Sequence, residues 1–234
     1  MKSEIITRPI SLEHPNVKRV LKIAEEIMSS NKVLNIDNLY HIAKRTLKIP
    51  RKGLLSIIQF LINKKVLIEG SKYSRKTVLL NRTRNEIYKF IKKTQAVHFS
   101  HIRKRIGKES SIEATSSGQL IWHLEMLLKF NYIKKYKLGN YTIFSPIKLD
   151  EETAIIKFLL DDTLNKEIIS LVYSKTSLKR SEIHKILEKK RENVYYHVAN
   201  LIDYEILTLK EKDGNEISIN PKKMRIIELL LKVK

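Results

Sequence analysis

Side chains that commonly carry out chemistry are sparse in this sequence, and their spacing excludes most active sites. The chain has seven histidines and no cysteine, so disulfides, thiolate metal sites and cysteine nucleophiles are excluded. His98 and His101 form an i, i+3 pair, but a metal site needs further ligands, and few candidates lie nearby. No Ser/His/Asp order, glycine-rich phosphate loop or carboxylate pair stands out. We therefore expect no enzyme activity, metal site or cofactor.

A second unusual pair is Trp122–His123, within the stretch GQLIWHLEMLLKFNYIKK (118–135). Trp122 is the single tryptophan of the chain. The apolar residues of this stretch recur at helical spacing, at Leu120, Leu124, Leu127 and Leu128. Trp122 and His123 lie off that stripe, so a role besides filling the core has to be considered for both.

The charge of the chain favours a polyanionic partner. The 234 residues include 46 Lys and Arg against 25 Asp and Glu, a net charge of +21. Such a basic surface is typical of proteins that bind nucleic acid, and we expect double-stranded DNA. An anionic membrane would usually require a Lys-rich amphipathic anchor with Trp or Phe, so no membrane partner is expected. The abundance of Ile, Lys, Asn and Tyr also fits the bias of an AT-rich genome.

The sequence lacks the features of an exported or membrane protein. Its first residues contain no apolar signal-peptide segment, and the longest apolar runs are about four or five residues, too short to cross a bilayer. The absence of cysteine fits a reducing compartment. We expect a cytoplasmic protein.

The elements that must position these side chains follow one pattern, repeated three times. The stretches 53–70, 118–135 and 192–210 align at offsets of 66 and 74 residues, with apolar residues in register. Each is preceded by a helix with a 3.6-residue apolar period and by a short second helix, expected at 39–46, 99–106 and 181–187. The expected domains are residues 1–81, 82–149 and 150–234, the last including a linker helix (149–162) and a C-terminal helix.

Each third helix is followed by two apolar stretches that predict a β-hairpin. The turns are expected in SKYSRK (71–76), at Gly139–Asn140 and at Asp213–Gly214. Three helices followed by a hairpin is the winged helix-turn-helix plan. The predicted fold is mainly α with small β-wings, in three tandem winged helix-turn-helix domains.

The third helices resemble the recognition helices of ArsR-type winged helix-turn-helix regulators. The family's recognition helix reads roughly small–aliphatic–polar–polar–His–Leu–x–x–Leu. NVYYHVANLIDYEIL (193–207) matches this pattern well, GQLIWHLEMLLKFNYI (118–133) matches it with departures, and GLLSIIQFLINKKVLI (53–68) lacks the His. The resemblance implies a DNA-binding regulator, of a kind found as multi-winged-helix proteins in archaea. The metal sensing of some relatives relies on Cys clusters, so it does not carry over.

The residues expected to contact DNA lie on the third helices and the wings, where side chains reach base edges and phosphates. They are Arg51, Lys52, Ser56, Gln59, Tyr73, Arg75, Lys76, Ser117, Gln119, Lys134, Lys137, Asn140, Tyr141, Asn193, Tyr195 and Tyr196. Ser116 or Ser117 is expected to cap the helix that follows. By the resemblance, His123 and His197 hold their helices against the wings.

Other residues are expected at interfaces with protein. Trp122 is assigned to packing between domains or subunits, with DNA contact and simple burial as alternatives. Ile227, Leu230 and Leu231 form an apolar stripe in the C-terminal helix, which can bury against its own domain or against a second chain. A homodimer or protein partner could therefore use domain 3 and this helix.

The charge is distributed unevenly among the three expected domains. Residues 1–81 carry 16 basic and 6 acidic groups, residues 82–149 carry 14 and 4, and residues 150–234 carry 16 and 15. DNA binding therefore belongs first to domains 1 and 2, where counterion release would act. The sequence favours a transcriptional regulator; the alternative is a winged-helix scaffold that binds proteins, as in endosomal sorting complexes and basal transcription or polymerase-associated factors.

Overall fold

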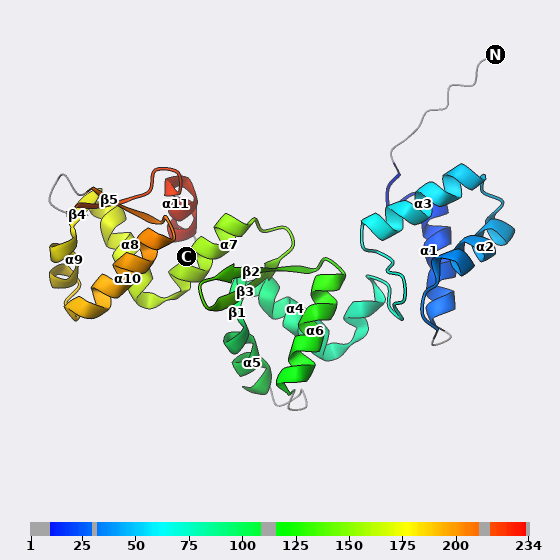
Figure 1. Ribbon diagram of the computed structural model, residues 1–234, viewed down its shortest axis with the longest axis horizontal. Helices are drawn as coiled ribbons and strands as arrows, with labels where there is room; N and C mark the ends of the chain where they lie inside the picture. The colour runs from blue at the N-terminus through cyan, green and yellow to red at the C-terminus, as the bar shows by residue number, and fades with distance from the viewer. Residues whose placement is uncertain (1–9, 30–31, 109–115, 211–215, 233–234) are drawn as a thin grey trace, which may run out of the picture. The chain divides into compact units, whose positions relative to one another are not determined.

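The chain is mainly helical, with small sheets between the helices (Figure 1). The computed structural model describes residues 10–29, 32–108, 116–210 and 216–232. It divides into two compact units: Met1–Phe90 with Arg105–Ile133, and Ile91–Lys104 with Lys134–Lys234. The predicted mainly α fold with β-wings is confirmed. The domain boundaries 1–81, 82–149 and 150–234 stay a prediction.

The first unit begins with three helices that pack on one another, as expected for the first repeat. They are α1 (Pro15–Ser29), α2 (Ile36–Leu47) and α3 (Arg51–Asn63). The Asn35 side chain caps α2 by accepting a hydrogen bond from the backbone N–H of Asn38 (2.8 Å). Pro50 ends the connection and α3 begins directly after it. One face of each helix supplies the core, which includes Val20, Ala24, Leu39, Leu54 and Leu61.

The hairpin expected after α3 is not formed, and that prediction was wrong. Residues 66–76 contain no strand, and a 3-10 helix, η1, follows at Thr77–Leu80. Local side-chain bonds replace strand pairing: Ser74 is buried, its hydroxyl donates to Glu25 (3.0 Å), and its backbone N–H donates to the Thr77 hydroxyl (2.9 Å). The backbone of Gly70 donates to Leu34 O (2.8 Å), so this segment is attached to the start of α2 instead.

The next helices are α4 (Arg82–Thr94), α5 (Phe99–Lys108) and α6 (Ser117–Lys129), at the places expected for the second repeat. Ser116 caps α6 in a capping box with Gln119, which confirms one of the two predicted caps. The predicted wing is present as β2 (Ile133–Leu138) and β3 (Tyr141–Pro146), with Gly139 at φ 55° in the turn. A short strand that the sequence did not predict, β1 (Val97–His98), pairs antiparallel with β3.

The second unit continues with α7 (Glu151–Asp161), which confirms the predicted linker helix. The three helices expected in the third repeat follow as α8 (Thr163–Lys175), α9 (Arg180–Ile186) and α10 (Arg191–Asp203). Its wing is β5 (Leu207–Lys210) and β6 (Glu216–Ile219), and β6 also pairs antiparallel with the unpredicted β4 (Ser177–Lys179). The predicted turn at Asp213–Gly214 lies outside the described residues. The core of this unit includes Ile168, Val172, Ile183, Val198 and Ile217.

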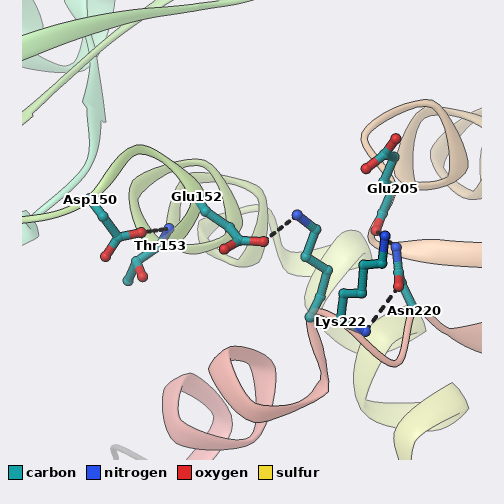
Figure 2. A network of polar contacts seen from close by, with 7 residues as sticks. Asp150, Glu152, Thr153, Glu205, Asn220 and Lys222 are labelled. Atoms are coloured by element: carbon teal, nitrogen blue, oxygen red, sulfur yellow. Dashed lines mark hydrogen bonds and ion pairs between the residues drawn. The ribbon is translucent and has the colours of Figure 1, made fainter.

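The last helix, α11 (Met224–Lys232), packs against α7. The turn before it is held by polar contacts. Lys223 pairs with Glu152 of α7. The Asn220 side chain donates to Glu205 O (2.8 Å), as Figure 2 shows. On α7 itself, Asp150 caps the helix through the N–H of Thr153 (2.8 Å), and this hydrogen bond lowers the pKa of the Asp150 carboxyl. Among the helices that the structure describes, none has the length and apolar character to cross a bilayer.

Candidate nucleic-acid interface

The α3 helix presents a polar, basic face to solvent. Leu54, Ile57, Ile58 and Leu61 are buried, whereas Arg51, Lys52, Ser56 and Gln59 are exposed. No side chain caps the helix and no acidic residue lies in its first turn, so its N-terminal N–H groups have no capping side chain and two cations lie in the same turn. The Ser56 hydroxyl donates to Lys52 O (2.9 Å) and the Gln59 amide donates to Asn63 (2.8 Å). Both hydrogen bonds lie on the surface of the helix, where a ligand could take the place of the accepting group.

The residues expected at the first wing tip have different surroundings from those of a hairpin tip. Arg75 donates to Asn131 O (3.1 Å), lies over the Tyr132 ring at 5.1 Å and accepts, through its backbone carbonyl, a 2.6 Å hydrogen bond from the Tyr132 hydroxyl. The Tyr73 ring lies 5.2 Å from the Arg84 guanidinium. Lys76 is exposed. Of these cations, Lys76 therefore has the more accessible charge.

The polar residues at the start of α6 are largely occupied in building the helix. The Gln119 side-chain oxygen accepts from the Ser116 N–H (2.9 Å), and the Ser116 hydroxyl accepts from the Gln119 N–H (3.2 Å). Ser117 is half-buried. Further along, Ile121 and Trp122 are exposed, so the solvent face of α6 is more apolar than that of α3.

The β2–β3 wing presents cations and an aromatic ring. Lys137 and Asn140 are exposed and Lys134 is half-buried. Tyr141 is also exposed, and its ring contacts those of His98 (5.2 Å) and Phe158 (5.8 Å). The wing therefore has the accessible lysines that contact with phosphates requires.

On α10 the three residues expected at DNA differ in accessibility. Asn193 and Tyr196 are exposed. Tyr195 is half-buried, because its ring lies 4.4 Å from the Arg180 guanidinium and 5.0 Å from that of Arg191. The ring of Tyr195 is thus already in contact with two cations, whereas that of Tyr196 is free to contact a partner.

Trp122 packs against a buried arginine. The guanidinium of Arg84 lies 4.8 Å from the Trp122 ring and 5.2 Å from the Tyr73 ring, and it donates to Val78 O (2.7 Å). Arg84 is 1% exposed, and burial lowers the pKa of its guanidinium while Tyr73 opposes that shift. Trp122 remains 48% exposed. One part of the indole is therefore packed on a cation and the rest is available to a partner.

The two histidines that follow the aromatic residues are placed differently. His123 is buried, its Nδ1 has no hydrogen-bond partner among the described residues, and burial together with Arg84 lowers its pKa. His197 is half-buried, and its Nδ1 lies 2.9 Å from Asn165 Oδ1 and 3.6 Å from Asp162 Oδ1. Both effects favour the neutral form of His123.

The remaining residues singled out in the sequence are the apolar stripe of α11 and the pair His98 and His101. Ile227 is fully buried in the core of the second unit, and Leu230 and Leu231 are partly buried against that core. His98 bonds Ser100 through Nδ1 (2.8 Å), and burial followed by the effect of His101 lowers its pKa. Within the described part of the chain, no group of three or more His, Cys, Asp and Glu side chains could hold a metal ion.

Sequence reasoning missed the residues that support the two aromatic–histidine pairs. Arg84 and Asn165 each lie three residues after the capping side chain of their helix: Asn81 accepts from the Arg84 N–H and Asp162 from the Asn165 N–H, both at 2.9 Å. The capping residues are a usable sequence signal for these two positions. Neither reveals which side chain would face the third helix.

No protein-family model matches the chain. A curated relative, an uncharacterized HTH-type transcriptional regulator of Methanocaldococcus jannaschii, is 32% identical over 169 residues. The match covers 71% of this chain and 41% of the relative. The chain thus spans less than half the length of the relative that it matches.

Proposed function

We propose that this protein is a cytoplasmic, DNA-binding transcriptional regulator of the ArsR-like winged helix type, with three tandem units of which the second and third carry wings, and that it acts by occupying duplex DNA. The observation that carries the proposal is the exposed face of α3. Its N-terminal N–H groups, which no side chain caps, would bind phosphates together with Arg51 and Lys52, while Ser56 and Gln59 would reach base edges. The similarity to an HTH-type transcriptional regulator supports the same function.

The charge distribution supports α3 and the β2–β3 wing as the main DNA contacts. Residues 1–81 and 82–149 each carry a net charge of +10, whereas residues 150–234 carry +1. The field that attracts a polyanion therefore arises where α3 and the lysines of the wing are found. Counterion release from the phosphates would make the affinity fall steeply with salt.

The test is a salt titration of duplex binding by the full chain. We expect Arg51→Ala with Lys52→Ala to weaken binding and to lower the log–log salt slope by roughly 1–2, because up to two phosphate contacts are lost. The matched control is Arg19→Ala with Lys22→Ala, which removes the same charges from exposed positions on α1. Equal losses for the two double variants would show that only net charge matters and would remove α3 from the interface.

A second candidate function, a protein-binding scaffold, is favoured by the exposed apolar residues of two third helices. Ile121 and Trp122 on α6 are 51% and 48% exposed, and Tyr196 on α10 is 64% exposed. Aromatic side chains are enriched at protein interfaces. If the scaffold function holds, Trp122→Ala should abolish co-purification of a partner while duplex affinity is retained; a homodimer through domain 3 would instead appear as a concentration-dependent mass in sedimentation.

A further inference from the structure

A cleft of about 650 Å³ in the second unit has a lining unlike the rest of the protein. It lies among the β2–β3 turn, α7, the start of α8, and α10, and its volume is in the range of small-molecule sites. About one residue in five of the chain is Lys or Arg. Yet none of the described residues that line this cleft is Lys or Arg, so the only basic side chains that an anion would meet among them are the imidazoles of His101 and His197.

Aromatic rings make up much of the wall. Tyr141 comes from the wing, Phe158 from α7, and Tyr196 and Tyr204 from α10 and its C-cap. Tyr204 touches the wing turn, since a Cβ placed on Gly139 would lie 3.0 Å from the Tyr204 hydroxyl. Burial, with Tyr196 and Tyr141 nearby, raises the pKa of Tyr204, which keeps its phenol neutral.

Two carboxylates lie at the same cleft, and one of them has no other role. Asp162 caps α8 through the N–H of Asn165 (2.9 Å) and lies 3.6 Å from His197 Nδ1. Asp161 is exposed and makes no ion pair with any residue that the structure describes. A negative charge and several π faces thus converge on one cavity in a protein whose net charge is strongly positive.

From this lining we propose that the cleft binds a small organic cation, an amine or quaternary ammonium with an apolar body. The aromatic faces of Tyr141, Phe158 and Tyr196 would attract the cationic head through their quadrupoles. Asp161 would supply the balancing charge, and the amide of Asn200 a hydrogen bond to an N–H donor. No residue of α3 lines the cleft, whereas Asn140, Tyr141 and Tyr196 line it and are also among the residues expected at DNA.

The test uses benzyltrimethylammonium as the probe and benzyl alcohol as its neutral counterpart, each titrated into the full chain by ligand-observed NMR at about 0.15 M ionic strength. We expect the cation to bind at least about fivefold more tightly than the alcohol, because cation–π attraction acts on the cation alone. Equal affinities, or no binding of the cation up to a concentration on the order of 10 mM, would overturn the proposal.

Variants locate the bound cation. Tyr196→Leu and Asp161→Asn alter exposed side chains, and each should weaken binding of the probe about two- to fivefold. Asp37→Asn is the matched control: it removes one carboxylate from an exposed position on α2, outside the cleft, and should leave the affinity unchanged. If all three variants bind equally well, the probe does not occupy this cleft and the proposal fails. No DNA is present, so either outcome leaves the proposed function untouched.

Discussion

The aromatic–histidine pairs of α6 and α10 have similar sequences and different supports. Both pairs are in edge-to-face contact, Trp122–His123 at 5.0 Å and Tyr196–His197 at 5.6 Å between ring centroids. In the first pair the supporting residue is Arg84, a buried cation that stacks on the indole. In the second it is Asn165, which hydrogen-bonds the imidazole. A repeated motif can therefore be kept while the side chain that supports it changes from a charge to an amide.

The difference has an electrostatic consequence. Arg84 places a positive charge beside His123, so protonation of this histidine is disfavoured both by burial and by repulsion. His197 instead has a carboxamide and a carboxylate within 4 Å, groups that can accept hydrogen bonds from an imidazole. The α6 pair depends on stacking and burial, and the α10 pair on hydrogen bonds.

The largest expected effect comes from removing the cation of the α6 pair. Arg84→Ala deletes a fully buried side chain, two ring contacts and the bond to Val78 O, and should lower the free energy of unfolding of the first unit by about 2–4 kcal/mol. Urea unfolding followed by Trp122 fluorescence measures it. Arg84→Lys is the control: it keeps the charge and loses the planar stack, so a variant as stable as the wild type would show that stacking contributes nothing.

Trp122→Ala should have a smaller effect, because half of the indole is already exposed. We expect a loss of about 1–2 kcal/mol, from lost burial and lost contact with Arg84, in chemical unfolding followed by circular dichroism. This is less than the roughly 3–5 kcal/mol typical of a fully buried Trp. A loss as large as that would contradict the half-exposed position.

The pH dependence of stability tests the surroundings of His123. The folded-state pKa of His123 is below its ordinary value of about 6.5, so the unfolded chain takes up the proton first as the pH falls. Stability is therefore intact above about pH 6.5 and is lost below it, at up to about 1.4 kcal/mol per pH unit, until the folded-state pKa is reached.

The control for this effect is His123→Gln, compared with the wild type in urea unfolding at a series of pH values. The variant cannot titrate at position 123 and should lose this part of the acid sensitivity. An unchanged pH profile would mean that His123 is protonated equally in the folded and unfolded states.

The smallest effect is expected at the other aromatic residue. Tyr196 is 64% exposed and has no cation on its ring among the described contacts, so Tyr196→Ala should change the free energy of unfolding by no more than about 0.5 kcal/mol. Thermal unfolding of the second unit measures it. A loss equal to that of Trp122→Ala would remove the distinction between the two pairs.

Features that depend on neighbouring residues could be predicted from the sequence. The spacing of apolar residues and the residues that end or cap a helix located the helices: Pro50 precedes α3 and Ser116 caps α6. Gly139 located a hairpin turn, because it adopts the positive φ that this turn needs. The strands β1 and β4 were missed because two or three residues are too short to show alternation.

Features that depend on residues far apart in the chain could not be predicted from the sequence. The segment after α3 has two apolar stretches with a polar stretch between them, as a hairpin does, but Ser74 bonds Glu25, 49 residues away, and Gly70 bonds Leu34. In the candidate site, we expected Arg75 to contact DNA. Its hydrogen bonds with Asn131 and Tyr132 join distant parts of the chain, so they could not be predicted from the sequence. The polar face of α3 was foreseeable, because helical spacing alone separates its exposed and buried residues.

The contact between Arg75 and Tyr132 also couples the local unfolding of two segments, the loop after α3 and the end of α6. Each residue donates a hydrogen bond to the backbone of the other's segment, Arg75 to Asn131 O and Tyr132 to Arg75 O, across 56 and 57 residues of sequence. Separation of the two segments would break both hydrogen bonds. Their amide protons should therefore exchange with solvent as one cooperative unit, in which the loop after α3 has the same lifetime as the end of α6.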